Sequence, residues 1–389
     1  MIDAVIVSAV RTGVGRGKKD GSLAAVHPAE LAGRVIAEAV ARGGVRKEDV
    51  DDVLLGCAMP EGSQGLNVAR LALLKAGLPV ETSGSTINRF CSSGLQTIAL
   101  GAQGIMSGMI ETAVAGGIEM MSQVPMSGYH TRLHPELTES YIGMGFTAER
   151  VAERWQVNRA DQDQFALESH QKAARAWSEN RFAPELVPMP VERVTWKGAE
   201  KQVEETAYAR DELVRPETTL EALGRLRPAF KATGTVTAGN ASPYSDGAAA
   251  LLMTTREKAE AEGLPILARL VAFATSGVDP DIMGIAPIKA VPKALKKAGM
   301  SMKDIDLIEM NEAFAAQALA VARVLEMPME RLNVNGGAIA LGHPLGATGA
   351  KLTTHLIHEL RRRGGGRGLV TMCVGGGMGA AGIFEIYPA

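Results

Sequence analysis

The chain has 389 residues, of which 46% are hydrophobic and 22% charged, and its formal net charge is −2. These values are ordinary for a globular protein of two or three domains, which can bury a large core without disulfide bonds or a structural metal. The near-neutral charge argues against nucleic acid as the main partner, because phosphate binding requires a basic excess. The three cysteines lie far apart, so neither a disulfide scaffold nor a zinc site is expected.

No segment resembles a membrane span or an address signal. The sequence contains no run of about 18 apolar residues, and its first residues lack the basic start and long apolar stretch of a signal peptide. We therefore expect a protein that works in the cytoplasm, without a membrane partner.

Short apolar strands alternate with helices in the first third of the chain. Strands are predicted at 4–10, 52–58, 85–88 and 112–117, and helices at 29–42, 66–76 and 92–107. This alternation is typical of layered α/β folds.

The alternation stops in the middle of the chain and then resumes. Residues 119–244 contain a loop rich in Met, Pro and His (119–140), an amphipathic helix near 160–178 and a charged, proline-rich stretch (184–217). We expect this region to be an insertion that covers the active site. Beyond it, strands are predicted at 248–254, 265–277, 305–310, 368–374 and 381–387, and helices at 286–297, 313–325 and 348–362.

Landmarks of the first half return 255 residues later. The segments 49–51 and 304–306 each precede a predicted strand (304 − 49 = 255), and the helices that begin near Cys91 and Gly346 keep the same offset (346 − 91 = 255). The other explanation is a coincidence between common strand–helix patterns. The repeat predicts two α/β units, each of which points a helix N-terminus at a shared seam.

The expected division of the chain follows from the repeat and the insertion. The N-terminal half is residues 1–118, completed by 245–266. The inserted loop domain is 119–244, and the C-terminal half is 267–389.

Cys91 lies between a predicted strand and a helix, in the motif NRFCSSG (88–94). A thiol at a helix N-terminus faces backbone N–H groups and the positive end of the helix dipole, which favour the thiolate. The dipole lowers a thiol pKa by about one unit, so a nearby base is also needed. We interpret Cys91 as a nucleophile. The alternative is an inert buried cysteine, which is our interpretation of Cys57.

His343 lies between glycine and proline in the motif GHPLG (342–346). A tight turn holds an imidazole in one orientation, as a general base requires, whereas the alternative is a histidine that only caps the turn. In the repeat His343 falls three residues before the position equivalent to Cys91, so both turns should face the same seam. The histidines interpreted as exposed on their helices are His170, His355 and His358.

Cys373 ends a predicted strand and precedes the run VGGGMG (374–379). Glycines leave backbone N–H groups open to a ligand, so this run can form an oxyanion hole. A phosphate-binding loop is the other interpretation. It is weaker, because a strand follows the run and the P-loop motif is absent from the sequence.

Asn311 begins the motif NEAF (311–314) after a predicted strand. An asparagine at this point can cap the following helix, or it can hold a water molecule or donate to an oxyanion. The small-residue loop 237–247 suits tight turns or close approach to an extended ligand.

Together these motifs resemble those of thiolases, and most of all the degradative 3-ketoacyl-CoA thiolases (acetyl-CoA acyltransferases). The resemblance covers essentially the whole chain and rests on NRFCSSG, NEAF, GHPLG and CVGGGMG in that order. It implies a duplicated, layered α/β/α/β/α fold and an acyltransferase that acts on acyl-CoA with coenzyme A as co-substrate. It also implies a homodimer or homotetramer without a metal or covalently bound cofactor.

The resemblance implies a role for each motif residue. Cys91 would carry the acyl group, His343 would take its proton, and Cys373 would be the acid/base at the acetyl carbon. Asn311, through a bound water, and His343 would hold the enolate oxygen, while the backbone N–H groups of Cys91 and Gly375 would hold the oxyanion of the acyl-enzyme. The coenzyme A site would be lined by Arg215, Phe230, Ala238 and Ser242, and the acyl pocket would be bounded by Met144 and Phe314.

One position departs from the biosynthetic acetoacetyl-CoA thiolases. Those enzymes carry a histidine just before the Met-Gly of the covering loop, where this chain has Gly143 before Met144. We therefore expect medium- or long-chain 3-ketoacyl-CoA substrates, with the biosynthetic activity (acetyl-CoA C-acetyltransferase) as the alternative. A β-ketoacyl synthase would need a second histidine where Asn311 stands. A non-catalytic acyl-CoA- or lipid-binding protein would be favoured if Cys91 or His343 were missing.

Overall fold

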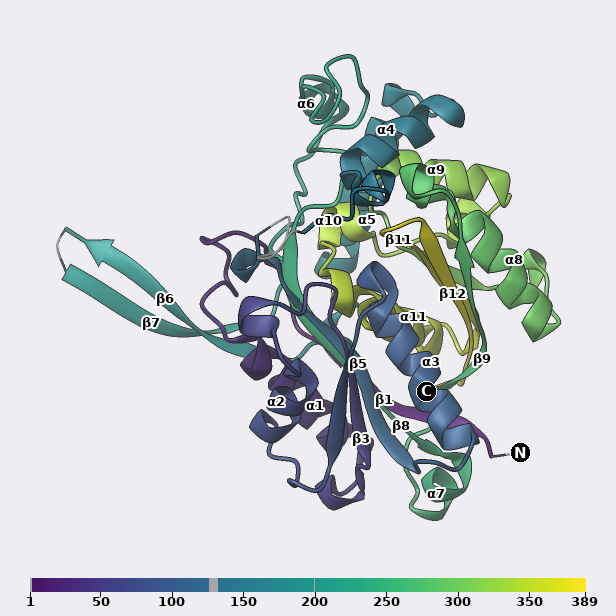
Figure 1. Ribbon diagram of the computed structural model, residues 1–389. Helices are drawn as coiled ribbons and strands as arrows, with labels where there is room; N and C mark the ends of the chain where they lie inside the picture. The colour runs from purple at the N-terminus through teal and green to yellow at the C-terminus, as the bar shows by residue number, and fades with distance from the viewer. Residues whose placement is uncertain (1, 126–131, 199) are drawn as a thin grey trace.

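The computed structural model describes residues 2–125, 132–198 and 200–389, and Figure 1 shows the arrangement of its elements. The strands are β1 (Ala4–Arg11), β2 (Gly15–Arg16), β3 (Asp52–Gly56), β4 (Ser83–Ile87), β5 (Thr112–Met120), β6 (Met189–Lys197), β7 (Glu200–Tyr208), β8 (Ser245–Thr255), β9 (Ala268–Gly277), β10 (Leu307–Met310), β11 (Gly366–Val374) and β12 (Met378–Ile386). The α-helices are α1 (Pro28–Gly43), α2 (Val68–Lys75), α3 (Ser93–Met106), α4 (Met144–Arg154), α5 (Arg159–Ser178), α6 (Leu220–Gly224), α7 (Arg256–Ala261), α8 (Pro287–Ala298), α9 (Ala315–Val324), α10 (Ala338–Leu341) and α11 (Leu345–Arg362).

Within the described residues a ten-stranded sheet runs in the order β10-β11-β12-β9-β1-β8-β5-β3-β4, and β2 pairs with β8 beside this path. Its two halves repeat one pairing. β3 lies parallel to β5 with Asp52 opposite Ala113, and β10 lies parallel to β11 with Leu307 opposite Gly368. Both registers have the offset of the sequence repeat (307 − 52 and 368 − 113 each give 255), so the duplication is confirmed.

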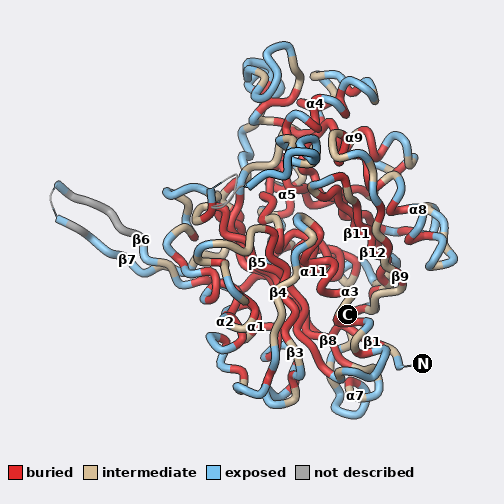
Figure 2. Tube along the Cα trace, in the orientation of Figure 1, coloured by how far each residue is buried: buried red, intermediate tan, exposed pale blue. Residues whose placement is uncertain are grey.

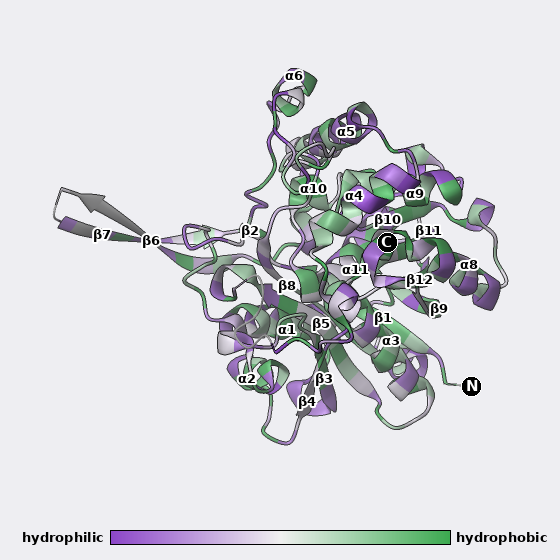
Figure 3. Cartoon of the chain, turned by 45° about the horizontal axis from the view of Figure 1, so that its top comes forward, coloured by the Kyte–Doolittle hydropathy of each residue, from purple (hydrophilic) through white to green (hydrophobic). Residues whose placement is uncertain are grey.

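The helices form three layers around the two halves of the sheet. α1 packs on β1, β5 and β8, α3 and α11 lie together between the halves, and α8 packs on β9, β11 and β12. Three clusters of buried side chains fill the spaces between these five layers, and they are part of the red interior of Figure 2. In Figure 3 the central strands β5 and β8 are coloured mainly as hydrophobic. The predicted α/β/α/β/α layering is therefore confirmed.

The two middle helices cross closely because each has a glycine at the crossing. A Cβ on Gly94 of α3 would lie 2.7 Å from the backbone nitrogen of Ala350, and a Cβ on Gly349 of α11 would lie 2.2 Å from that of Leu95. The two glycines are equivalent in the repeat (349 − 94 = 255). Since both lie near the starts of their helices, the crossing brings the two predicted catalytic turns together.

The region between β5 and β8 differs in part from its predicted form. It contains α4, which was not predicted. The charged stretch 184–217 contains a hairpin of the antiparallel strands β6 and β7, in which Met189 lies opposite Tyr208 and Lys197 lies opposite Glu200. The hairpin projects from the body of the molecule in Figure 1. Residues 202–205 are all exposed, so no buried face requires apolar and polar residues to alternate along the strand. Of the predicted loop 119–140, residues 126–131 lie outside the described residues.

The interpretation of three histidines as exposed is wrong. α11 lies between the sheet halves and is buried on nearly all sides, so His355 is only 3% exposed and its Nδ1 lies 2.9 Å from the Glu185 carboxylate. His358 is half-buried with its Nε2 2.9 Å from the Ala9 carbonyl. α5 packs against α9 and α10, and His170 is buried there.

None of the helices in the described ranges has both the length and the apolar character that a membrane span requires.

Candidate active site

Cys91 lies in a single 3₁₀ turn, Phe90–Ser92, directly before α3, as predicted. The preceding Phe90 has φ = +42°, which is uncommon for a residue other than glycine. Its amide donates to Asn88 Oδ1 (2.8 Å), and its carbonyl accepts from Ser93 Oγ (2.6 Å). These two bonds hold a strained turn in which the residue Cys91 is partly exposed, and such strain is concentrated at functional sites.

The surroundings of Cys91 keep its thiol protonated until a base acts. Burial raises the pKa of Cys91 to about 11, against a hydrogen bond from the Gly375 backbone that lowers it. Burial, together with the proximity of Cys91, also holds the pKa of Cys373 well above its usual range. Cys91, Gly375 and Cys373 therefore lie together, and both thiols are neutral near pH 7.

His343 lies in the turn between α10 and α11 and is buried. Its Nε2 is 3.2 Å from Asn311 Nδ2, and its Nδ1 is 2.6 Å from Thr348 Oγ1. Burial, and secondarily the Lys351 ammonium, lower the pKa of His343 to about 3, so the ring is neutral and can accept a proton. The interpretation of Asn311 as a helix cap is wrong, because the N-cap of α9 is Phe314.

The glycine run forms the tight turn between β11 and β12. Gly376 and Gly377 have φ of +76° and +81°, a conformation that glycine adopts without steric cost. A Cβ on Gly375 would lie 3.6 Å from the Phe90 ring and 3.9 Å from Met144 Sδ, so this backbone faces the catalytic turn. Because β12 follows the run, no helix N-terminus is available for a phosphate, which argues against the phosphate-loop interpretation.

The predicted catalytic residues thus lie at the adjoining ends of several elements. Asn311 follows β10 and Cys373 lies near the end of β11, which is the neighbouring parallel strand. The turns of Cys91 and His343 precede the crossed helices α3 and α11. Among the described residues no hydrogen bond joins Cys91 to His343, and in ligand-free enzymes such catalytic contacts are often long.

A buried carboxylate that the motif analysis missed links the two sides of the site. Glu119, at the end of β5, accepts hydrogen bonds from the backbone amides of Ala58 (2.9 Å) and Gly346 (2.8 Å). It also accepts from Gln64 Nε2 at 2.9 Å. It therefore ties the loop after β3 to the start of α11. In the sequence Glu119 has no surrounding motif and marks only the beginning of the insertion.

An apolar wall leads away from the two thiols. Phe314 packs in one cluster with Cys373 and Met144, as the predicted acyl pocket requires. The Phe314 ring centroid is 6.2 Å from that of Phe230, which in turn is 6.2 Å from that of Phe146. Phe146 was not predicted as a site residue. It lies on α4, the helix that the sequence analysis also missed.

The other residues predicted to contact coenzyme A lie on loops near this wall. Arg215 and Ala238 are exposed, whereas Ser242 is half-buried and its backbone amide donates to the Ala313 carbonyl at 3.0 Å. Glu149 of α4 accepts hydrogen bonds from the backbone amides of Thr235 and Val236, each at 2.9 Å. It therefore holds the loop that carries Ala238 against the helix.

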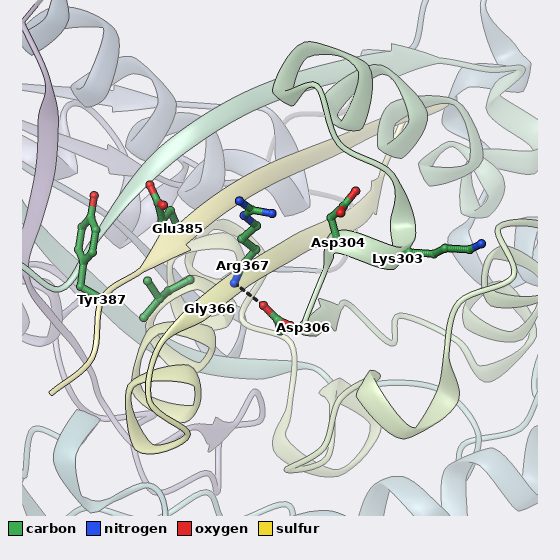
Figure 4. A pocket seen from close by; sticks show the side chains of 8 residues that line it. Lys303, Asp304, Asp306, Gly366, Arg367, Glu385 and Tyr387 are labelled. Carbon is green, nitrogen blue, oxygen red and sulfur yellow. Dashed lines mark hydrogen bonds between the residues drawn. The ribbon is translucent and has the colours of Figure 1, made fainter.

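A separate surface hollow lies at the opposite end of β11 from Cys373 (Figure 4). Its lining mixes the acids Asp306 and Glu385 with the bases Lys303 and Arg367. Asp306 already accepts a hydrogen bond from the Arg367 backbone at 2.8 Å. The hollow therefore presents no single charge to a ligand, and it is not part of the candidate site.

Two family models match the chain: "Thiolase, N-terminal domain" over residues 4–257 and "Thiolase, C-terminal domain" over residues 264–386. The chain belongs to the thiolase family. The family resemblance stated from the four motifs is thereby confirmed, and the protein is an acyltransferase-type enzyme of that family.

Relatives of this thiolase carry two kinds of name. A 3-ketoacyl-CoA thiolase of Bacillus subtilis (strain 168) is 53% identical, over 99% of this chain and 100% of its own. An acetyl-CoA acetyltransferase of Pseudomonas aeruginosa is 47% identical over 98% of both chains. The crystal structure of the Bacillus anthracis acetyl-CoA acetyltransferase superposes with a TM-score of 0.90 at 42% identity, over 99% of both chains.

Proposed function

We propose that this thiolase cleaves 3-ketoacyl-CoA with coenzyme A, yielding acetyl-CoA and an acyl-CoA shortened by two carbons, through an acyl-enzyme on Cys91. The observation that supports this most is the grouping of Cys91, Cys373 and the glycine backbone at Gly375, together with a neutral His343 bonded to Asn311. Carbon–carbon cleavage needs each of these parts: a nucleophile, an acid for the leaving carbon, and donors for two oxyanions.

In the first half-reaction His343 takes the proton of Cys91, and the sulfur attacks the keto carbon of the substrate. The backbone N–H groups of Cys91 and Gly375 hold the resulting oxyanion; each such donor is worth about 3–4 kcal/mol. The bond between C2 and C3 then breaks. Its electron pair passes to an enolate of acetyl-CoA, whose oxygen is held by His343 and by a water on Asn311, and Cys373 protonates the carbon.

In the second half-reaction coenzyme A releases the acyl group. The thiol of coenzyme A gives its proton to the enzyme and attacks the thioester at Cys91, which leaves as a thiol. The covalent intermediate implies ping-pong kinetics. The loops that carry Arg215, Ala238 and Ser242, together with Phe230, would bind coenzyme A, and Met144 and Phe314 would bound the acyl pocket.

The proposed substrate class is the medium- to long-chain, degradative one, and the biosynthetic acetyl-CoA acetyltransferase activity is the second candidate. Gly143 favours the former because it leaves space beside Met144, and each buried methylene is worth about 0.8 kcal/mol. The names of several relatives favour the latter. Gly143 has φ = −63°, and a Cβ there would lie 3.4 Å from the Phe146 ring, so a side chain at this position is tolerated.

Substrate kinetics and acyl labelling test this proposal. Acetyl-CoA should add an acetyl mass to the peptide that contains Cys91, and kcat/KM should be higher for the C8 than for the C4 3-ketoacyl-CoA. Gly143→His should fold normally and shift the preference toward C4. Acetylation of Cys373 instead of Cys91 would reverse the assigned roles, and a C4 preference of about tenfold, or 1.4 kcal/mol, would favour the biosynthetic function.

We also propose a cytoplasmic homodimer or homotetramer. β4 is an edge strand of the sheet, and free edges are normally covered. Near it Leu66 is 96% exposed with φ = +57°, and Val80 is 68% exposed. An apolar side chain held in a strained, exposed turn is explained by a partner chain that covers it.

We propose an N-terminal half (1–118 with 245–266), an inserted loop domain (119–244) and a C-terminal half (267–389). The antiparallel pairing of β8 with both β5 and β1 supports the assignment of 245–266 to the N-terminal half.

A further inference from the structure

Among the residues that the structure describes, each nitrogen of the His343 ring has one hydrogen-bond partner. Nδ1 lies 2.6 Å from Thr348 Oγ1, and the same hydroxyl lies 2.9 Å from the carbonyl oxygen of Pro344, four residues before it in the chain. Nε2 lies 3.2 Å from Asn311 Nδ2. Thr348 is 0% exposed, so water does not compete for its hydroxyl.

The hydrogen-bond partners of the His343 ring decide which of its two nitrogens carries the hydrogen. The side-chain nitrogen of an asparagine can only donate, so Asn311 Nδ2 donates to the lone pair of Nε2. A neutral imidazole has one N–H group, so the ring hydrogen then lies on Nδ1. Thr348 Oγ1 therefore accepts from Nδ1–H, and its own hydrogen is donated to the Pro344 carbonyl, which also accepts from the Ala347 amide at 2.9 Å.

We propose that Thr348 is a positioning residue that holds His343 in the Nδ1–H tautomer and thereby makes Nε2 the atom that takes the Cys91 proton. Nε2 has one lone pair, so the Asn311 N–H must release it before Nε2 takes that proton. The ring then becomes an imidazolium with hydrogens on both nitrogens, the sulfur keeps the electron pair, and Thr348 still accepts from Nδ1–H. This role deepens the proposed function and rests on it.

The other hydrogen bonds of the turn before α11 fix its backbone and do not select a tautomer of the His343 ring. The His343 amide donates to Ser245 Oγ (2.9 Å), and Lys351 Nζ donates to the Gly342 carbonyl (3.1 Å). Gly342 has φ = +89°, which a side chain would oppose. Among the described residues Thr348 is the side chain bonded to Nδ1. Its χ1 angle is restricted because it is β-branched within a helix and bonded to the carbonyl four residues back.

The test compares three variants of α11. Thr348→Val keeps the shape but removes the hydroxyl, whereas Thr348→Ser keeps the hydroxyl. Thr353→Val is the matched control, because Thr353 is equally buried and bonds the Gly349 carbonyl at 2.8 Å without contacting His343. In Thr348→Val we expect kcat to fall about 100-fold, within the range of general-base catalysis, with KM nearly unchanged. Thr348→Ser should retain most of kcat, and Thr353→Val should resemble wild type.

Nitrogen-15 NMR of histidine-labelled enzyme, assigned with His343→Asn, reads the tautomer directly. Wild type and Thr348→Ser should show hydrogen on Nδ1 and a bare Nε2, and Thr348→Val should lose this preference. Hydrogen on Nε2 in the wild type would overturn the proposal even if Thr348→Val failed to fold, and so would an unchanged kcat in a folded Thr348→Val. The NMR result is independent of turnover. Failure of acyl labelling at Cys91 would therefore refute the proposed function while leaving the tautomer measurable.

Discussion

Cys91 and Cys373 lie close together but differ in how far they are exposed. Cys91 is partly exposed in a strained turn and faces the Gly375 amide, so a substrate can reach it. Cys373 is 1% exposed and lies in the same apolar cluster as Ala313 and Phe314, so in the proposed mechanism its proton is retained until a carbanion forms beside it. Accessibility and desolvation thus support a nucleophile and an acid made from the same side-chain type.

This difference predicts the effect of removing the second thiol. Cys373→Ala should still form the acyl-enzyme at Cys91, detected by mass spectrometry, because the nucleophile and its base remain. It should not exchange the acetyl α-protons of acetyl-CoA with deuterium, because the acid at that carbon is lost. The buried Cys57→Ala is the control and should retain both reactions. Exchange at the wild-type rate in Cys373→Ala would exclude Cys373 as the carbon acid/base.

Helices α3 and α11 set the geometry between the turns of Cys91 and His343, which we propose to be catalytic. Gly349→Ala places a Cβ against the Leu95 backbone, and overpacking of this kind costs about 1–3 kcal/mol. We expect a lower free energy of unfolding and a reduced kcat, because the helices must separate. Gly224→Ala is the control, since a Cβ there meets no atom within 4 Å. A Gly349→Ala variant with wild-type stability and kcat would show that the crossing can relax without consequence.

Helix α5 carries a buried histidine that makes stability depend on pH. His170 Nδ1 accepts a hydrogen bond from the Arg215 amide at 3.2 Å. Burial, followed by the charge of Arg215, lowers the pKa of His170 to about 4. In the unfolded chain this pKa is about 6.5. Below pH 6.5 the unfolded chain therefore binds a proton that the folded chain does not. The contribution of His170 to stability is complete above pH 6.5 and is lost as the pH falls toward 4.

The variant His170→Asn isolates this contribution, because it keeps an acceptor but does not titrate. Between pH 7 and pH 5 the wild type should lose about 2 kcal/mol of unfolding free energy more than His170→Asn. Urea unfolding at the two pH values measures both. Equal losses in the two proteins would mean that His170 is protonated in the folded state at pH 5.

For the whole molecule the free edge at β4 predicts self-association. Leu66→Asn should leave the isolated chain stable, because asparagine tolerates a positive φ. It should weaken the dimer by about 10- to 100-fold, the equivalent of losing a buried leucine. Met109→Asn, at an 84% exposed position, is the control. Sedimentation equilibrium measures the dissociation constants. An unchanged constant for Leu66→Asn would remove Leu66 from the interface.

Local sequence patterns by themselves predicted much of the fold of this protein. Apolar runs and their breaks predicted the strands and helices of both halves, because each element buries a face that must be apolar. The 255-residue repeat predicted the duplication. The short motifs placed Cys91, His343 and Asn311 in turns between elements and Cys373 near the end of a strand, since glycine, proline and small residues mark such turns locally.

Other features were decided only by the tertiary structure, because they depend on which surfaces meet. Helical periodicity could not show that α11 is covered on nearly all sides, so His355 was interpreted as exposed. The β6–β7 hairpin buries too little to impose an alternating pattern. Glu119 and Thr348 act through bonds to atoms that the fold brings to them. A carboxylate or hydroxyl acquires such a role from its partners, and those partners become visible only when the chain is folded.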